Sequence, residues 1–298
     1  MELRVLEYAL VLSQEKNFSK AAEKLHIAQP SLSQQIKKLE QEVGIQLFER
    51  RPGEIELTYA GKRFIDQAAK ILDQVEQLKK EMMDVANLKK GQLIIGSLPI
   101  TGSYLLPLSL PLFQKQYPGI EVKLIEETTS NLEAITAKGQ TDISLLSLPI
   151  QHPGVEGIPF LEEEILLVVP PSHPLANQKQ VNLADFHQES FILLKKGQGF
   201  RQITEQLCMQ FGFQPNVIFE SMNIETIQSL VSTGMGISFV PKMVSRSNRL
   251  QEAAPVYLHL GNPPPTRTLV IGYKKDRYLS KAALAFIDVM KEVAKQFN

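Results

Sequence analysis

The chain has 298 residues, of which 43% are hydrophobic and 21% charged, as in ordinary globular proteins. This length suffices for two or three compact units, and the composition excludes a disordered or fibrous chain. The formal net charge of +0 gives no support for nucleic-acid binding, which must be argued from where the cations lie. We see no signal peptide and no apolar run of a membrane span, and the single cysteine, Cys208, suits a reducing cytoplasm.

Two short helical patterns lie close together in residues 18–39, and only residues 26–29 separate them. Their apolar positions are Ala21, Ala22, Leu25, Leu32, Ile36 and Leu39. So short a joint makes two helices cross steeply, as in a helix-turn-helix. Pro30 fits the first turn of the second helix, where its missing N–H costs nothing.

The second helix has a polar face. At 100° per residue its apolar residues, which include Val43, gather opposite a face that carries Ser33, Gln34 and Lys37. Hydroxyl, amide and ammonium groups of this kind read base edges and contact phosphates in the major groove. The alternative is an ordinary solvated face on a helical hairpin.

A strand pattern follows. Gly44 closes the second helix, and beyond the turn dipeptide Pro52-Gly53 apolar Ile55 and Leu57 alternate with polar residues. We predict a two-stranded wing whose tip lies along the phosphate backbone. The predicted DNA-binding residues are Ser19, Lys20, Gln29, Pro30, Ser31, Ser33, Gln34, Lys37, Arg50 and Arg51.

At this point the chain resembles the LysR-type transcriptional regulators. The stretches AAEKLHIAQPSLSQQIKKLEQEVGIQLFER and LTYAGKRF carry the resemblance, which is strongest over residues 1–65. It implies an α/β protein with an N-terminal all-α winged helix-turn-helix, a long linker helix, and a two-lobed effector domain like the periplasmic binding proteins. It also implies promoter binding as a homodimer or homotetramer and a response to small metabolites.

The linker has a heptad pattern. Residues 62–90 contain neither Gly nor Pro, and apolar residues recur at alternating spacings of four and three, at Phe64, Ala68, Ile71, Val75, Leu78, Met82 and Val85. This a/d repeat favours a coiled coil with a second copy. A single amphipathic helix packed on its own domain is the alternative. We therefore expect a DNA-binding domain at 1–60, a dimerisation helix at 61–90 and an effector domain at 91–298.

Short apolar runs alternate with helical stretches after Gly91. We predict strands at 93–96, 120–125, 143–148, 165–169, 191–194, 217–219, 237–240 and 268–273, and helices at about 103–116, 131–138 and from 280. Such alternation indicates a parallel sheet with right-handed crossovers. The resemblance implies that lobe one comprises about 92–162 plus 268–298, and lobe two about 163–267. The prolines at 263–265 would form a stiff hinge segment.

Ligands of such sheets lie beyond the carboxyl ends of the strands, against helix N-termini. Loops with hydroxyl groups or glycines occur there at residues 97–103, 128–130 and 197–201, although helix caps and turns would explain each loop by itself. The predicted effector-binding residues are Ser97, Pro99, Ile100, Thr101, Ser103, Thr128, Thr129, Ser130, Ser147, Phe200 and Arg201. Their chemistry suits a small anion, with Arg201 as the cationic partner unless it is simply solvated.

Other signals point away from catalysis. The five histidines are scattered without metal-ligand spacing, and we find no nucleophile elbow or P-loop. We interpret Glu162, Glu163 and Glu164 as a solvated acidic run, and Cys208 as a buried structural thiol. We predict a cytoplasmic, sequence-specific regulator that binds double-stranded promoter DNA and a small anionic effector, with no metal or cofactor. RNA polymerase is a further candidate partner, and an architectural DNA-binding protein or an enzyme with a DNA-binding appendage are the alternatives.

Overall fold

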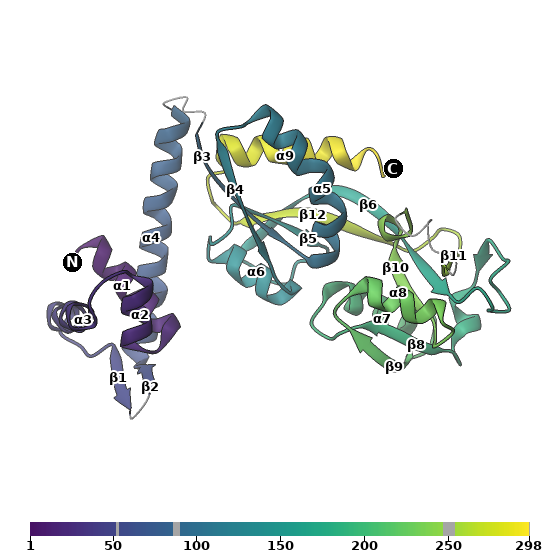
Figure 1. Ribbon diagram of the computed structural model, residues 1–298, viewed down its shortest axis with the longest axis horizontal. Helices are drawn as coiled ribbons and strands as arrows, with labels where there is room; N and C mark the ends of the chain where they lie inside the picture. Colours follow the sequence, from purple (N-terminus) through teal and green to yellow (C-terminus); the bar gives the residue numbers. More distant parts are fainter. Residues whose placement is uncertain (52–53, 86–89, 247–253, 298) are drawn as a thin grey trace. The chain divides into compact units, whose positions relative to one another are not determined.

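The computed structural model describes residues 1–51, 54–85, 90–246 and 254–297. It also leaves the side chains at positions 50, 51, 54, 83, 85 and 246 undescribed. The chain forms two compact units, Met1–Ala86 and Asn87–Asn298. Figure 1 shows the helical first unit with its long helix α4, and the α/β second unit.

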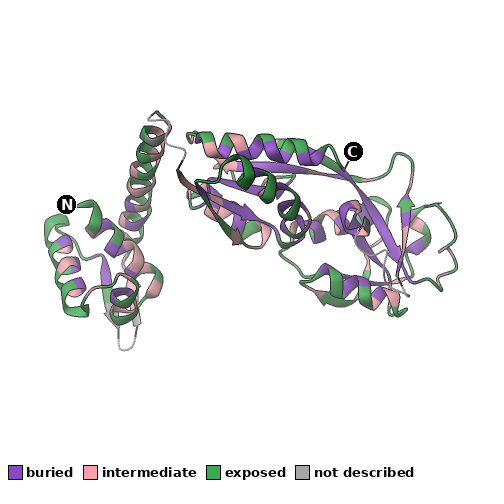
Figure 2. Ribbon diagram, turned by 45° about the horizontal axis from the view of Figure 1, so that its top comes forward, coloured by how far each residue is buried: buried purple, intermediate pink, exposed green. Residues whose placement is uncertain are grey.

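The first unit is built on helices α1 (Leu3–Glu15), α2 (Phe18–Lys24) and α3 (Gln29–Val43). Asn17 begins α2, because its side chain accepts hydrogen bonds from the N–H groups of Ser19 and Lys20. Pro30 lies in the first turn of α3, and Gly44 ends that helix in the left-handed conformation, both as predicted. The small core unites these helices with the start of the wing, as the buried positions in Figure 2 show. Its buried members include Leu12, Ala21, Ala22, Leu32, Ile36, Leu39, Leu47 and Phe48.

The predicted wing is present. Strand β1 (Phe48–Arg51) pairs antiparallel with β2 (Glu54–Leu57), so that Phe48 lies opposite Leu57. The turn residues Pro52 and Gly53 lie outside the described residues. Glu40 of α3 fastens the wing to the helices, because its carboxylate accepts the N–H groups of Leu47 and Phe48 at 2.8 and 3.0 Å.

Helix α4 (Tyr59–Val85) continues from the wing without a break. Its first turns pack on α1, where Ile65 and Ala68 are buried. Gly61 allows α4 to approach the segment before β1, because a Cβ there would stand 2.0 Å from the backbone oxygen of Leu47. Further along, the seam residues Ile71, Leu78 and Met82 are 38, 57 and 53% exposed, so the domain's own core does not cover them.

In lobe one of the second unit, strands β3 (Gly91–Ser97), β4 (Ile120–Glu126) and β5 (Ile143–Ser147) lie parallel with β3 in the middle. Helices α5 (Pro99–Gln116), α6 (Thr129–Ala137) and α9 (Lys281–Ala294) pack against this part of the sheet. Strand β12 (Thr266–Lys274) returns to pair with β5, but antiparallel. The predicted parallel pairing therefore holds for β3, β4 and β5 but not for β12, which enters from the other lobe.

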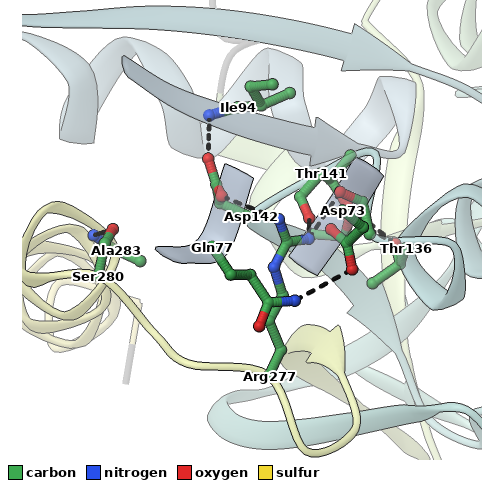
Figure 3. Close-up of polar contacts among 11 residues, drawn as sticks. Asp73, Gln77, Ile94, Thr136, Thr141, Asp142, Arg277, Ser280 and Ala283 are labelled. Atoms are coloured by element: carbon green, nitrogen blue, oxygen red, sulfur yellow. Dashed lines mark hydrogen bonds and ion pairs between the residues drawn. The ribbon is translucent and has the colours of Figure 1, made fainter. Parts of the chain in front are cut away.

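A polar network supports the edge of lobe one (Figure 3). The carboxylate of Asp142 accepts the backbone N–H of Ile94 at 2.8 Å. Arg277 donates to the backbone oxygens of Gly139 and Thr141, at 2.6 and 2.8 Å, and pairs with Asp142 at 3.7 Å. Because these bonds join residues 136 to 138 positions apart, they attach the chain after β12 to the loop before β5.

Lobe two contains helices α7 (Gly199–Gln210) and α8 (Ile224–Ser232), with the short 3₁₀ segments η1 (Leu183–Phe186) and η2 (Lys242–Arg246). Its strands β8 (Ser190–Leu194) and β9 (Asn216–Ser221) pair in parallel. The strands β7 (Gln180–Val181), β10 (Ser238–Pro241) and β11 (Val256–Leu260) belong to the same eight-stranded sheet as the strands of lobe one. The sequence did not predict β11 or the two-residue β7, but the other strands of this lobe follow the predicted positions.

Strand β6 (Val155–Val169) connects the lobes (Figure 1). Residues 155–164 pair with β12, and residues 165–169 pair with β10 and β11. At this crossing Ile165 donates its N–H to the oxygen of Pro265, at 2.9 Å. The proline run therefore lies beside the place where the chain changes lobes.

The interpretation of the triple acid as a solvated run is wrong for two of its members. Glu163 and Glu164 are only 4 and 9% exposed, whereas Glu162 remains at the surface. Glu163 forms an ion pair with buried Arg267, and Glu164 pairs with Lys242 and with His259 of β11. Buried carboxylates require such partners, because an uncompensated buried charge costs several kcal/mol.

Candidate functional site

The polar face of α3 lies at the surface of the first unit. Six of the predicted residues, Ser19, Lys20, Gln29, Pro30, Ser31 and Gln34, are exposed, as is Lys37, and Ser33 is half-buried. The side chains of Arg50 and Arg51 lie outside the described part, although their backbones form the end of β1. Val43, the last residue of α3, is 40% exposed, so the core does not reach the end of the apolar face. The helix thus presents hydroxyl, amide and ammonium groups on a largely exposed face.

A cavity of about 170 Å³ lies between the lobes of the second unit, where the N-terminal ends of α5, α6 and α7 meet. We name it the α5 cavity. Its walls combine apolar side chains with a few polar groups, as ligand sites commonly do. It is lined by Leu98, Pro99, Ile100, Thr101, Glu126, Glu127, Thr128, Thr129, Gln198, Gly199, Phe200, Met222 and Arg267.

The sequence-predicted effector residues divide into two groups. Pro99, Ile100, Thr101, Thr128, Thr129 and Phe200 line the α5 cavity. The others lie elsewhere: Ser97 is buried and donates to the oxygen of Leu98, and exposed Ser103 donates to that of Pro99. Ser147 lines a much smaller space behind Thr129, while Ser130 and Arg201 line a second cavity. Strand-end loops therefore do converge, but with only part of the predicted set.

Arg201 is buried in ion pairs within lobe two. It pairs with Glu205 at 2.8 Å and with Glu220 at 2.9 Å, and it donates to the backbone oxygen of Leu194 at 2.7 Å. It is thus not solvated, although its Nε atom is buried without a hydrogen-bond partner in the described part of the chain. Two carboxylates already neutralise it, so a ligand anion would have to compete with both.

Arg267 is the cation of the α5 cavity, and sequence reasoning missed it. Its Nε and Nη2 atoms donate to Oε1 of Glu163, the Nε bond measuring 2.7 Å, and its guanidinium carbon lies 5.1 Å from the centre of the Phe200 ring. Among the described residues, none accepts a hydrogen bond from Nη1. Glu163 therefore holds the guanidinium in place and leaves one donor group for the cavity.

Thr101 has a buried hydroxyl without a hydrogen-bond partner in the described part of the chain. Two other hydroxyls of the same helix, those of Ser103 and Ser109, donate to carbonyl groups four residues earlier. A buried unsatisfied polar atom costs about 1–3 kcal/mol. Its position in the first turn of α5, beside the cavity, fits a group that a ligand satisfies.

The single thiol of the chain, that of Cys208, is buried and unreactive. Cys208 is fully buried in α7, as predicted, and burial together with the charge of Glu205 raises the pKa of its thiol to about 12. A thiol that stays protonated is a poor nucleophile. No group of residues in the described ranges could hold a metal ion, and no described helix is both long and apolar enough to cross a membrane.

Comparisons with known proteins agree with this architecture. Residues 3–62 match the family described as "Bacterial regulatory helix-turn-helix protein, lysR family", and residues 86–295 match the "LysR substrate binding domain". The chain therefore belongs to the LysR family of DNA-binding transcriptional regulators, which carry an effector-binding domain and are not enzymes. Its N-terminal helix-turn-helix, long helix α4 and two α/β lobes have the arrangement typical of that family.

Several relatives align over nearly the whole chain. The uncharacterized HTH-type transcriptional regulator YcgK of Bacillus subtilis is 41% identical over 99% of this chain and 96% of its own length. The dual regulator OxyR of Escherichia coli K12 is 33% identical over 92% of this chain and 90% of its own. The solved structure of a full-length OxyR variant from Pseudomonas aeruginosa superposes with a TM-score of 0.79, at 27% identity, covering 100% of this chain and 96% of that one.

Proposed function

We propose that this regulator binds promoter DNA in response to a small monoanionic metabolite, such as a monocarboxylic acid, held in the α5 cavity. The observation that carries the proposal is the uncommitted Nη1 donor of Arg267 beside the unsatisfied hydroxyl of Thr101 in one cavity. The N-terminal end of α5 adds a favourable potential for negative charge. Apolar Leu98, Ile100, Phe200, Met222 and Pro99 would surround the rest of the molecule.

The carboxylates at the cavity limit the charge of the ligand. Glu126 and Glu127 both line the α5 cavity, and Glu127 already accepts a hydrogen bond from Asn131 at 3.1 Å. Negative charges at this range would repel a phosphate ester or a dicarboxylate more strongly than a monocarboxylate. We therefore place the ligand among small monoanions rather than polyanions.

Regulation would act through the lobes. Residues from both lobes line the cavity, so a ligand that bridges them gains its full contacts only when they are close together. It can shift the lobe equilibrium only by its difference in affinity for the two states. The division into a DNA-binding domain (1–60), a linker helix (61–90) and an effector domain (91–298) belongs to the same proposal.

On the DNA side, we assign base reading to the exposed face of α3 and phosphate contacts to the wing. Ser33, Gln34 and Gln29 would face base edges, whereas Lys37, Arg50 and Arg51 would neutralise phosphates. The uncovered seam of α4 at Ile71, Leu78 and Met82 supports a homodimer through this helix. A dimer would present paired recognition helices to two half-sites.

A response to peroxide through thiol chemistry is a second candidate, because several relatives are named hydrogen peroxide-inducible genes activators. Two properties of the chain disfavour it. These 298 residues contain a single cysteine, so they cannot close an internal disulfide, and the pKa of that thiol is raised. Binding of a preformed metabolite suits the residues better than oxidation.

The proposal can be tested by calorimetry with a panel of small monocarboxylates against matched alcohols. We expect at least one acid to bind wild-type protein, and the Arg267→Lys variant to lose about tenfold or more in affinity, because lysine keeps the charge beside Glu163 but lacks the second donor group. Arg277→Lys, an arginine paired in lobe one away from the cavity, is the matched control. Equal binding by Arg267→Lys and wild type would contradict the assignment.

A further inference from the structure

A second cavity of about 530 Å³ lies on the other side of the contact between Thr129 and Gly199. Residues of α6 and of the loop after β5 line one side of it, and residues 196–205 of lobe two line the other. We name it the Glu133 cavity, after the acidic residue that is 2% exposed and lines its wall. It shares Thr129, Gln198 and Gly199 with the α5 cavity.

Glu133 is half satisfied. Its Oε2 atom accepts the backbone N–H groups of Gln151 and His152, at 3.0 and 2.8 Å. Its Oε1 atom is buried and has no hydrogen-bond partner in the described part of the chain. The bonds to Oε2 are explained by a role in anchoring the loop after β5. That role does not explain why the buried Oε1 atom has no donor.

The charged residues of the lining are two carboxylates, Glu133 and Glu205, and two cations, Arg201 and Lys196. Arg201 pairs with Glu205 and also with Glu220 of β9, which lies outside the lining, so its charge is already neutralised. Among the described residues, no cation forms an ion pair with Glu133, so its buried negative charge is uncompensated. The cations of the lining are Arg201, whose Nε atom is buried without a hydrogen-bond partner in the described part of the chain, and exposed Lys196. A buried negative charge attracts a cation more strongly than the same charge in water would.

We propose that the Glu133 cavity binds a small organic ammonium group, whose N–H donors satisfy Oε1 of Glu133. A primary ammonium is a compact cation with three donors, and it forms charge-assisted hydrogen bonds with a carboxylate. Because the cavity is lined from both lobes, a bound ammonium contributes to the same closure as a ligand of the α5 cavity. The proposal concerns a different cavity and different residues, and it does not require that the α5 cavity binds an anion.

The probe is n-butylammonium chloride, with n-butanol at equal concentration and ionic strength as the neutral comparison. Titration is followed on the full chain by ¹H–¹⁵N NMR at the amides of Gln151 and His152, which donate to Glu133 and so report directly on its carboxylate. We expect both amide signals to shift in a saturable way with butylammonium and not with butanol. Absence of a saturable shift would show that water alone fills the cavity and would overturn the proposal.

Variants locate the site. Glu133→Gln keeps an acceptor for the two amides but removes the charge, so we expect about a tenfold or greater loss of butylammonium affinity. Glu121→Gln, an exposed residue of β4 outside both cavities, should bind as wild type does. Lys196→Glu changes only an exposed side chain, and it should strengthen binding by removing a like charge. Unchanged butylammonium affinity in both Lys196→Glu and a folded Glu133→Gln would contradict the site. If Glu133→Gln does not fold, unchanged affinity in Lys196→Glu alone would contradict it.

The outcome is separable from that of the proposed function. Loss of monocarboxylate binding in Arg267→Lys with normal ammonium binding would support both sites. Failure of every monocarboxylate, with butylammonium still acting through Glu133, would remove the anion proposal and keep this one. The converse result would remove only the ammonium site.

Discussion

The backbone N–H of Gly199 donates a hydrogen bond of 2.8 Å to Oγ1 of Thr129. The two residues begin α7 in lobe two and α6 in lobe one, so this bond joins the lobes directly between the two cavities. The glycine makes the approach possible, because a Cβ at position 199 would stand 2.8 Å from that same oxygen. The contact therefore lies where, under the proposed function, a ligand of either cavity would bias the closure of the lobes.

Thr129→Val should weaken this closure. The substitution preserves shape but removes the acceptor, and one net hydrogen bond is worth about 0.5–1.5 kcal/mol. We expect the Gly199 amide to exchange with solvent up to about tenfold faster, as followed by hydrogen exchange. Thr129→Ser retains the hydroxyl and should stay close to wild type. Identical protection of Gly199 in all three proteins would mean that other contacts hold the lobes.

The buried pair of Glu163 and Arg267 should be strongly coupled in stability. Arg267→Met leaves a buried carboxylate without its counterion, and we expect a loss of about 3–5 kcal/mol in the free energy of unfolding. Adding Glu163→Gln removes the stranded charge and retains an acceptor for the N–H of Met243, so part of the stability should return. Denaturant unfolding of the two single variants and the double variant measures the coupling, and simple additivity would contradict it.

These two residues also show where sequence reasoning ends. Local periodicity was enough to predict the crossed helices, the wing and most strands, because each depends on neighbours in sequence. The bond between Arg267 and Glu163 spans 104 positions, and it decides both the burial of Glu163 and the direction of the guanidinium. No pattern within a short window reveals such a partner. For the same reason the sequence drew attention to Arg201 but gave no sign of its pairing with Glu220.

The predicted contacts of α3 and of the wing should differ in how far their contribution to affinity depends on the DNA sequence. Ser33→Ala with Gln29→Ala should weaken binding to a specific operator by about 1–3 kcal/mol per lost base contact and scarcely affect random DNA. Arg51→Ala should weaken both and lower the salt dependence, because a phosphate contact carries no sequence information. Fluorescence anisotropy at several salt concentrations distinguishes the two. A selective effect of Arg51 with indifferent Ser33 would reverse the orientation of the helix and wing.

The exposed seam of α4 predicts the assembly state. Val75→Lys with Leu78→Lys would place like charges against each other in a paired helix, so we expect a folded monomer with little operator affinity. Light scattering gives the mass, and circular dichroism checks the fold. Glu76→Lys, which places a new charge on the polar side of the same helix, should remain assembled. A doubly substituted chain that still dimerises would move the interface away from this helix.

The thiol of Cys208 should make alkaline stability depend on pH. Its pKa lies at about 12 in the folded chain against an ordinary value of 9.0, because burial disfavours the thiolate. The folded state therefore holds the thiol proton more tightly than the unfolded state does. The stabilisation that this proton gives to the folded state is complete below pH 9 and is lost as pH rises toward 12. Wild type should lose unfolding free energy more steeply than Cys208→Ala above pH 9. Equal slopes in denaturant titrations would show that the thiol titrates normally.

The most direct test of ligand control measures operator affinity and ligand together. A DNA site is first selected from random sequences by the wild-type chain, and its affinity is then measured by fluorescence anisotropy with and without the monocarboxylate that binds best. We predict that the ligand changes operator affinity in wild type and in Arg277→Lys. It should leave affinity unchanged in Thr101→Val and in Arg267→Lys, which should still bind the operator without ligand. A ligand response of wild-type size in both cavity variants would contradict the account.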